Sequence, residues 1–230
     1  IDQKAASGFV NASLALDQAR AVKDIQEQEL MRKASHLNDM AMAEITHFFK
    51  EGVTETDLAE QLKKIYRDLG ADGLSFEPLF AFGSNAASGH HWPDDTRLKP
   101  GDCILVDIGC TWEGYCSDMT RTFFYKNVTQ HQQEVYHTVL KANEEAEKAV
   151  TPGILLSSLD QIARGIITDK GYGSAFTHRL GHFIGLEDHE FGDVSSASAD
   201  RAVPGNIFSI EPGVYLENDM GVRVEDLVLV

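Results

Sequence analysis

Residues 101–124 read GDCILVDIGCTWEGYCSDMTRTFF, and the organisation of the whole chain can be worked out from this segment. Asp107 lies within a run of apolar, strand-forming residues, and Asp118 follows in an equally strand-like stretch. The glycines between them favour a turn, so the segment is typical of an antiparallel hairpin. With a turn centred between Trp112 and Glu113, the two carboxylates would stand nearly opposite each other on one face. Burial of two unpaired acids is costly, and their presence calls for a chemical reason.

A second hairpin near the end of the chain carries the same feature. Glu211 lies in SIEPGVY and Glu225 in GVRVEDLVLV, and the two stand equally far from Asn218 in the turn between them. Strand alternation places Arg223 on the same face as Glu225. Four carboxylates brought together in this way cannot all remain ionised without cations.

The elements around the two hairpins occur in the same order twice. Each half begins with two helices, continues with an extended stretch and a polar loop, and ends in its hairpin. In the first half the helices begin after Asp24 and Thr54 and stop at Gly52 and Gly70, and residues 76–82 are extended. In the second half the helices begin after Thr129 and at Ser158, and Ile162 and Ile166 face inward on the second of them. Residues 175–183 are extended, and residues 193–200 form the loop. This order predicts an α+β domain with an internal pseudo-two-fold duplication, in which helices cover a mainly antiparallel sheet.

Composition limits the classes of function. The chain has 230 residues, of which 43% are hydrophobic, enough for a sizeable core. No apolar run approaches the roughly 18–20 residues that span a bilayer, and no signal-peptide pattern opens the chain. The net charge of −16 makes nucleic acid and anionic membranes poor partners. Three cysteines (Cys103, Cys110 and Cys116) crowd into one hairpin without zinc-knuckle spacing, which favours free thiols in a reducing cytoplasm.

Histidines add a different type of metal-binding group. The stretch THRLGHFIGLEDHE holds His178, His182 and His189, and strand alternation puts the first two on one face. Gly181 and Gly185 permit close approach of another backbone. These glycines, and the absence of a glutamate directly after His178, argue against a helical HExxH zinc site.

Three explanations of the acids compete with a metal site. A glycosidase needs two carboxylates and leaves the second pair unused. An aspartic protease expects Thr or Ser after the catalytic aspartate, whereas Ile108 follows Asp107. Acids on a solvent-exposed strand face would need no functional explanation, but solvent exposure does not explain their symmetric placement in two hairpins. Metal binding accounts for all four.

The motifs VDIG, YCSDMTRTF, GHFIGLEDHE, SIEPGVY and GVRVED, in this order, resemble the pita-bread metallopeptidases. That family includes methionine aminopeptidase, Xaa-Pro aminopeptidase and prolidase, and the resemblance covers about residues 24–230. It implies the pita-bread fold, with a curved sheet, and a site for two divalent metal ions. Oxygen-rich ligation favours Mn²⁺, with Co²⁺ or Zn²⁺ as alternatives. The implied ligands are Asp107, Asp118, His182, Glu211 and Glu225, of which Asp118 and Glu225 would bridge the two ions.

The segments GVRVED and Asn85–His90 resemble the Xaa-Pro aminopeptidase and prolidase branch. The resemblance therefore implies hydrolysis of the bond between an N-terminal residue and proline in small peptides. By the same resemblance, Glu211 would accept the proton of the attacking water, while His189 and His90 would donate hydrogen bonds to the substrate carbonyl and the tetrahedral intermediate. His178 and Arg223 are candidates for contacts to the substrate or to the metal ligands.

The chain departs from the family pattern in two places. Phe183 replaces the middle glycine of GHGIG, which narrows the site or shapes one wall. Prolidases bind the free carboxylate of a dipeptide with an arginine before SIEPG, and Arg201 is the only basic residue in 193–204. Aminopeptidase and dipeptidase activities therefore both stay open. So do a methionine-type aminopeptidase and a non-catalytic peptide-binding module of the same fold.

Two further expectations concern the surroundings of this domain. Residues 1–23 are Ala- and Leu-rich, and we expect them to be the tail of a preceding N-terminal domain, with the catalytic domain at 24–230 cut short at its C-terminal end. The resemblance implies a homodimer for the full-length protein. Around His189, the neighbouring acids Glu187, Asp188 and Glu190 are expected to raise the pKa of the imidazole if they approach it.

Overall fold

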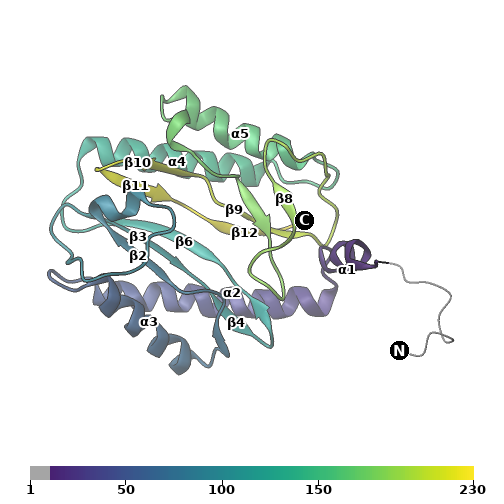
Figure 1. Cartoon of the computed structure of the whole chain (residues 1–230), viewed down its shortest axis with the longest axis horizontal. Coiled ribbons are helices and arrows are strands. Elements are labelled where there is room, and N and C mark those ends of the chain that lie inside the picture. Colours follow the sequence, from purple (N-terminus) through teal and green to yellow (C-terminus); the bar gives the residue numbers. More distant parts are fainter. Residues whose placement is uncertain (1–10) are drawn as a thin grey trace.

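The computed structural model describes residues 11–230, and the first ten residues of the expected tail lie outside that range. Its helices flank a central layer of strands (Figure 1). The α-helices are α1 (Ser13–Arg20), α2 (Ile25–Ile45), α3 (Glu55–Leu69), α4 (Gln130–Lys148) and α5 (Leu156–Asp169). Three short 3₁₀ turns accompany them: η1 (Thr46–Phe48), η2 (Gly83–Ala87) and η3 (Gly173–Ala175).

The strands form four small sheets, and every pairing is antiparallel. The first half contains the sheet β2 (Leu79–Phe82), β3 (Cys103–Ile108) and β6 (Met119–Phe124), together with β1 (Gly73–Leu74), β4 (Cys110–Trp112) and β5 (Tyr115–Cys116). The second half contains β12 (Asp226–Leu229), β9 (Ile207–Ile210), β7 (Gly181–Phe183) and β8 (Glu190–Val194) in that order, and the pair β10 (Gly213–Leu216) and β11 (Met220–Arg223). The α+β class with antiparallel strands is confirmed, although each predicted hairpin is broken into shorter ladders.

Each helix pair packs on the strands with its own apolar cluster. Helices α2 and α3 lie along one side of the molecule, and α4 and α5 lie along the other (Figure 1). Ile104, Val106 and Ile108 of β3 join the cluster under α2 and α3. Val222 and Val224 join the cluster under α4 and α5. Asp107 and Arg223 alternate with these residues, so they face inward, between the two halves.

Helix starts follow the predicted caps in three cases out of four. Asp24, Thr54 and Thr129 each form a capping box at the start of α2, α3 and α4. Helix α5 instead begins at Leu156, ahead of the predicted Ser158, because the Leu156 N–H donates to the Asp200 carbonyl (2.9 Å) in place of a side-chain cap. Two details were also wrong: α2 ends well before Gly52, and Leu159, Ala163 and Ile167 form the buried face of α5, with Ile162 and Ile166 only half-buried.

The first hairpin has a different register from the predicted one. Asp107 pairs with Thr120, and Trp112 pairs with Tyr115, so the turn consists of Glu113 and Gly114. Both residues have positive φ (47° and 84°), as a tight two-residue hairpin turn requires. The shift leaves Asp118 on the inner face, because a displacement of two residues along a strand preserves the face.

The predicted register of the second hairpin is confirmed. Gly213 pairs with Arg223 on one side of the acids, and Ile210 pairs with Asp226 on the other. Glu211 and Glu225 therefore occupy opposed positions in the gap between the two ladders.

Candidate metal centre

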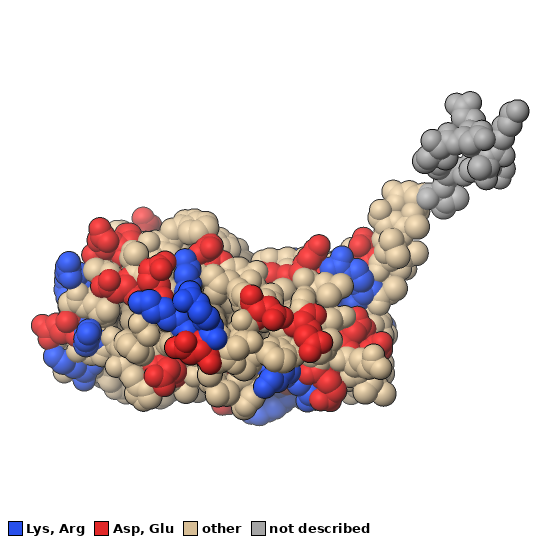
Figure 2. All heavy atoms as spheres, turned by 90° about the horizontal axis from the view of Figure 1, so that it is seen from below, with Lys and Arg blue, Asp and Glu red and all other residues tan. Residues whose placement is uncertain are grey.

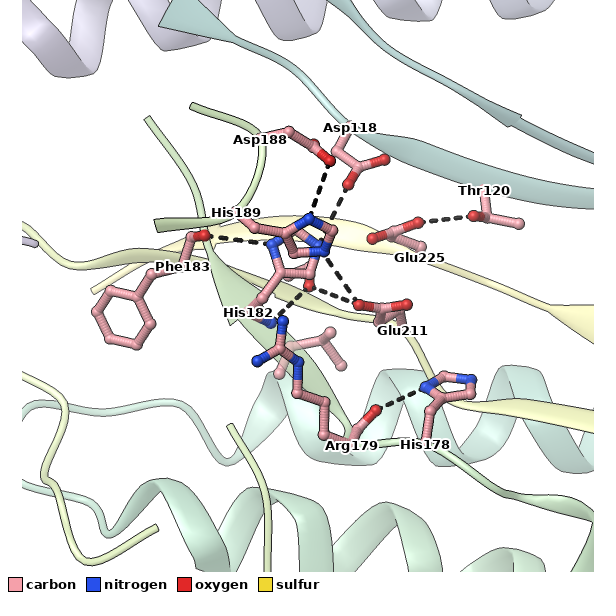
Figure 3. Close-up of polar contacts among 12 residues, drawn as sticks. Asp118, Thr120, His178, Arg179, His182, Phe183, Asp188, His189, Glu211 and Glu225 are labelled. Carbon is pink, nitrogen blue, oxygen red and sulfur yellow. Dashed lines mark hydrogen bonds and ion pairs between the residues drawn. The ribbon is translucent and has the colours of Figure 1, made fainter. Parts of the chain in front are cut away.

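All five predicted ligands line one cavity of about 410 Å³ between the two halves of the fold. Asp107 comes from β3 and Asp118 from the residue before β6. His182 lies in β7, Glu211 follows β9 and Glu225 precedes β12. Figure 3 shows Asp118, His182, Glu211 and Glu225 converging from these separate strands. The duplicated hairpins thus bring both carboxylate pairs to one place.

His182 lies at the centre of the acids. Its Nε2 atom is 3.4 Å from Asp118 Oδ2 and 3.5 Å from Glu211 Oε1. Its Nδ1 atom lies 3.2 Å from the Phe183 carbonyl, which leaves Nε2 as the nitrogen that faces the carboxylates. Donor atoms of Asp118, His182 and Glu225 lie within 4.8 Å of one another. This is a spacing that a shared ion can bridge.

Three carboxylate oxygens of the candidate ligands are buried and have no hydrogen-bond partner, namely Asp107 Oδ1, Asp118 Oδ1 and Glu225 Oε1, and Asp188 Oδ1 on the cavity wall is a fourth such oxygen. Buried polar atoms are nearly always satisfied, so this clustering requires an explanation. Carboxylate oxygens with one imidazole are a donor set that divalent ions such as Mn²⁺ accept. The residues present therefore fit a divalent metal site.

Burial controls the protonation of the cluster. It raises the pKa of Asp118 and of Glu225 well above the usual range, and nearby carboxylates add to the effect. It raises the pKa of Glu211 to about 7. Burial also lowers the pKa of His182 to about 3, so its imidazole is neutral and able to act as a ligand. Without a metal ion, burial thus favours the protonated, uncharged carboxyl groups, whereas a bound metal ion would favour their ionised forms.

Chelator-treated protein should lose stability as the pH rises from about 6.5 to about 8. The Glu211 pKa is about 7 in the folded chain, whereas an unfolded glutamate titrates near 4.3. Such a raised pKa contributes stability that is fully present below the unfolded value and is lost as the pH rises from that value through the folded one, so the last part of the loss, about 1 kcal/mol, falls between pH 6.5 and 8. Each pKa unit is worth about 1.4 kcal/mol. The test compares Tm at both pH values with chelator and with Mn²⁺; a chelated protein with a pH-independent Tm would contradict it.

Arg223 holds the Asp107 side of the site. Its guanidinium is buried and donates to Asp107 Oδ2 (2.5 Å), Thr120 Oγ1 (2.9 Å) and the Tyr215 hydroxyl (2.8 Å). Thr120 in turn donates to Glu225 Oε2 at 2.6 Å. Arg223 thus contacts two acids of the site, one directly and one through Thr120, and it also lines the cavity.

His178 lies outside β7, so the predicted single strand carrying it and His182 is wrong. Its Nε2 atom is 3.0 Å from the Tyr215 hydroxyl, which still brings it to the cavity wall. Burial lowers its pKa to about 4. The expectation for Gly181 is confirmed: a Cβ there would lie 1.9 Å from the Ser209 carbonyl.

His189 and His90 both line the cavity. The ring of His189 packs against that of His182 in a tilted arrangement (52° between planes) with 3.9 Å between centroids, and its Nδ1 atom lies 3.3 Å from Asp188 Oδ2. The expectation of a raised pKa is wrong: although the side chain is 61% exposed, partial desolvation of the ring, followed by the charge of Arg179, lowers the pKa of His189. Glu190, one of the acids expected to act on His189, instead forms ion pairs with Arg20 and Lys23.

The sequence prediction missed three contributors to the site. Asp188 and Tyr215 line the cavity, and each lies within a quoted motif, LEDHE and SIEPGVY. The buried Glu55 accepts hydrogen bonds from Phe82 N (2.7 Å) and Asp94 N (3.1 Å), and lies 2.7 Å from His91 Nε2. Because backbone amides donate to both of its oxygens, Glu55 anchors the loop that carries His90.

Arg201, the only basic residue in 193–204, does not line the cavity. Its Nη1 atom donates to the Gly153 carbonyl at 2.6 Å. The arginines that line the cavity are Arg179 and Arg223.

The model of metallopeptidase family M24 matches residues 29–230. The chain belongs to metallopeptidase family M24. Metallopeptidases of this family use divalent metals, in agreement with the carboxylate and imidazole groups found here. The M24 fold also confirms the predicted pita-bread architecture.

Solved M24 structures superimpose closely on the chain. The prolidase from Pyrococcus furiosus has a TM-score of 0.94 and 34% identity, and the match covers 96% of this chain and 66% of that one. The X-Pro aminopeptidase from Thermotoga maritima has a TM-score of 0.95 and 35% identity, over 97% and 63% of the two chains. An uncharacterized peptidase of Staphylococcus aureus is 41% identical over 224 residues. The chain spans 64% of the length of that relative.

Within residues 11–230, no helix combines the length and the apolar character needed to cross a membrane. On the α2–α3 side of the molecule, acidic and basic side chains are interspersed (Figure 2).

Proposed function

We propose that this chain is the catalytic domain of a dinuclear-metal exopeptidase that hydrolyses the bond between an N-terminal residue and proline. One observation carries the proposal: four carboxylates and a neutral imidazole meet in one cavity, and three of their buried oxygens have no partner. The names of two solved relatives, a prolidase and an X-Pro aminopeptidase, support the substrate class.

Asp107, Asp118, His182, Glu211 and Glu225 would hold the metal ions. Divalent ions supply Lewis acidity, which polarises a carbonyl and promotes the ionisation of water. Ser209 Oγ donates to Glu211 Oε1 (3.1 Å), which leaves Oε2 to take the proton of the attacking water. Thr120 and Arg223 fix the orientations of Glu225 and Asp107. The side chains of the site are thus set before a substrate arrives.

His189 and His90 would stabilise the developing oxyanion by donating hydrogen bonds. A neutral His189 that carries its proton on Nε2 has an unprotonated Nδ1, which accepts a hydrogen bond. Burial raises the pKa of Asp188 to about 7, so that this carboxyl can donate to Nδ1 near neutral pH. Asp188 would thus select the tautomer that donates into the cavity.

The test is a turnover assay of the full-length, Mn²⁺-loaded protein on three kinds of peptide. Xaa-Pro dipeptides, longer Xaa-Pro-Yaa peptides and Met-initiated peptides without proline separate the candidate activities. We expect hydrolysis only before proline. Preference for the Met-initiated peptides would favour the methionine-type alternative, and metal binding without turnover would favour a peptide-binding module. The relative rates on dipeptides and longer peptides distinguish a dipeptidase from an aminopeptidase.

We also propose a cytoplasmic location and a homodimeric full-length protein. Cys103, Cys110 and Cys116 are buried free thiols, as a reducing compartment allows. Burial raises the pKa of Cys103 and of Cys110 to about 11, so these thiols are unreactive. Light scattering of the full-length protein tests the dimer, and a monomer mass would overturn it.

A further inference from the structure

The loop between β7 and β8 carries Asp188 and His189, and Glu190 anchors it. The Glu190 side chain is only 3% exposed. Its Oε1 atom accepts hydrogen bonds from Leu186 N (2.9 Å) and from Arg20 (2.7 Å), and its Oε2 atom accepts one from Lys23 Nζ (2.8 Å). The Glu190 carboxylate thus links the two ends of the loop, and it links the loop to the end of α1 and to the segment between α1 and α2.

Lys23 is as deeply buried as its partner, with a side chain that is 1% exposed. Its backbone is fixed as well: Lys23 N donates to the Gly205 carbonyl (2.7 Å), and its carbonyl accepts from Gln28 Nε2 (2.9 Å). The ammonium group therefore stands on a rigid support. Removing either member of such a buried pair leaves an uncompensated charge, which is strongly unfavourable.

The loop packs directly against this ion pair. A Cβ at Gly185 would lie 2.8 Å from both Glu190 carboxylate oxygens and 2.8 Å from Lys23 Cε, so a side chain there would displace the ion pair. Helix α1 lies beside β8 (Figure 1), and it places Arg20 over the same carboxylate. None of Arg20, Lys23 and Glu190 lines the cavity, whereas Asp188 and His189 do. The pair therefore acts on the site indirectly, through the loop and through the β7–β8 ladder, in which Glu190 pairs with Phe183.

We propose that the Lys23–Glu190 ion pair positions His189, so that the segment preceding α2 controls the geometry of the reaction site. The two residues are 167 positions apart in the chain. Glu190 directly follows His189, whose ring packs against that of the candidate ligand His182. The part of this inference that concerns turnover rests on the proposed function, and the part that concerns the loop does not.

The experiment measures two quantities on full-length Lys23→Met, Glu190→Gln and Glu187→Gln proteins. The first is amide hydrogen exchange of residues 184–190 in the metal-free state, which reports how firmly the loop is held. The second is kcat and KM of the Mn²⁺-loaded protein on an Ala-Pro dipeptide, with metal content measured alongside. Glu187→Gln is the matched control: it removes a charge from the same loop at a side chain that is 68% exposed, so its 3.5 Å ion pair with Arg20 contributes little. Glu190→Gln keeps the shape of the side chain and is the variant to use if Lys23→Met does not fold.

We expect exchange in the loop to accelerate at least about tenfold in Lys23→Met and Glu190→Gln. We expect kcat to fall by about 10- to 100-fold, the usual effect of losing a partner that orients a functional group, at unchanged metal content. Glu187→Gln should match the wild type in both. Faster exchange with native kcat would make the pair merely structural, and unchanged exchange would refute its hold on the loop. A wild-type protein that hydrolyses no peptide would refute the proposed function instead, and the exchange measurement would still decide whether the pair holds the loop.

Discussion

His182→Ala should abolish stoichiometric metal binding and reduce peptide hydrolysis to background. His182 supplies the one imidazole among four carboxylates, and its Nε2 atom lies within 3.5 Å of oxygens of both Asp118 and Glu211. Losing a residue that merely orients a ligand costs about 10–100-fold in metal affinity. Losing the ligand itself should cost more than that. Without the imidazole, the acids face one another in a buried site and retain their protons.

Elemental analysis of Mn²⁺-loaded protein measures the effect, with about two ions per chain expected for the wild type. His47→Ala is a suitable control, since its side chain is 73% exposed and does not line the cavity. Wild-type stoichiometry in the His182→Ala protein would remove this histidine from the ligand set. A wild-type protein that binds no metal under the same conditions would remove the basis of the whole site.

The two hairpins show which structural features a local sequence pattern predicts and which it does not. Strand alternation placed all four acids on inner faces, because a face depends only on whether two residues are an even number of positions apart. The register of the first hairpin was wrong because its turn is Glu113–Gly114, with Glu113 at a positive φ that Asn or Asp adopts more readily. The error did not move Asp118 off the inner face, so the prediction of the site survived it.

Features that depend on distant contacts were not predictable. Helix α5 begins where the Asp200 carbonyl accepts from Leu156, and no residue near its start indicates this bond. The acids beside His189 were expected to act on its imidazole, but Glu190 pairs with Lys23 across 167 residues. Asp188 remains near His189, yet partial desolvation and the charge of Arg179 lower the pKa of the imidazole. Composition and periodicity contain no information on such pairings.

His189→Ala should bind metal normally and turn over Xaa-Pro peptides about 10²–10³ times more slowly, the usual cost of removing one oxyanion donor. The contact strengthens only as negative charge develops on the substrate oxygen, so kcat should fall more than KM rises. Loss of folding does not explain such an effect, because the side chain is 61% exposed. Its polar and aromatic contacts in the site are with Asp188 and with the His182 ring. Exposed substitutions of this kind usually change stability by about 0.5 kcal/mol or less.

His189→Gln separates donation from packing. Its amide can donate a hydrogen bond into the cavity, whereas alanine cannot, so glutamine should recover part of kcat if donation is the role of this residue. Metal content must be measured on both variants, because His189 touches the candidate ligand His182. Metal loss in His189→Ala would assign this residue to the support of His182. Near-native turnover in His189→Ala would leave it structural. A large fall in kcat with full metal content and partial recovery by glutamine is the result that places His189 at the oxyanion.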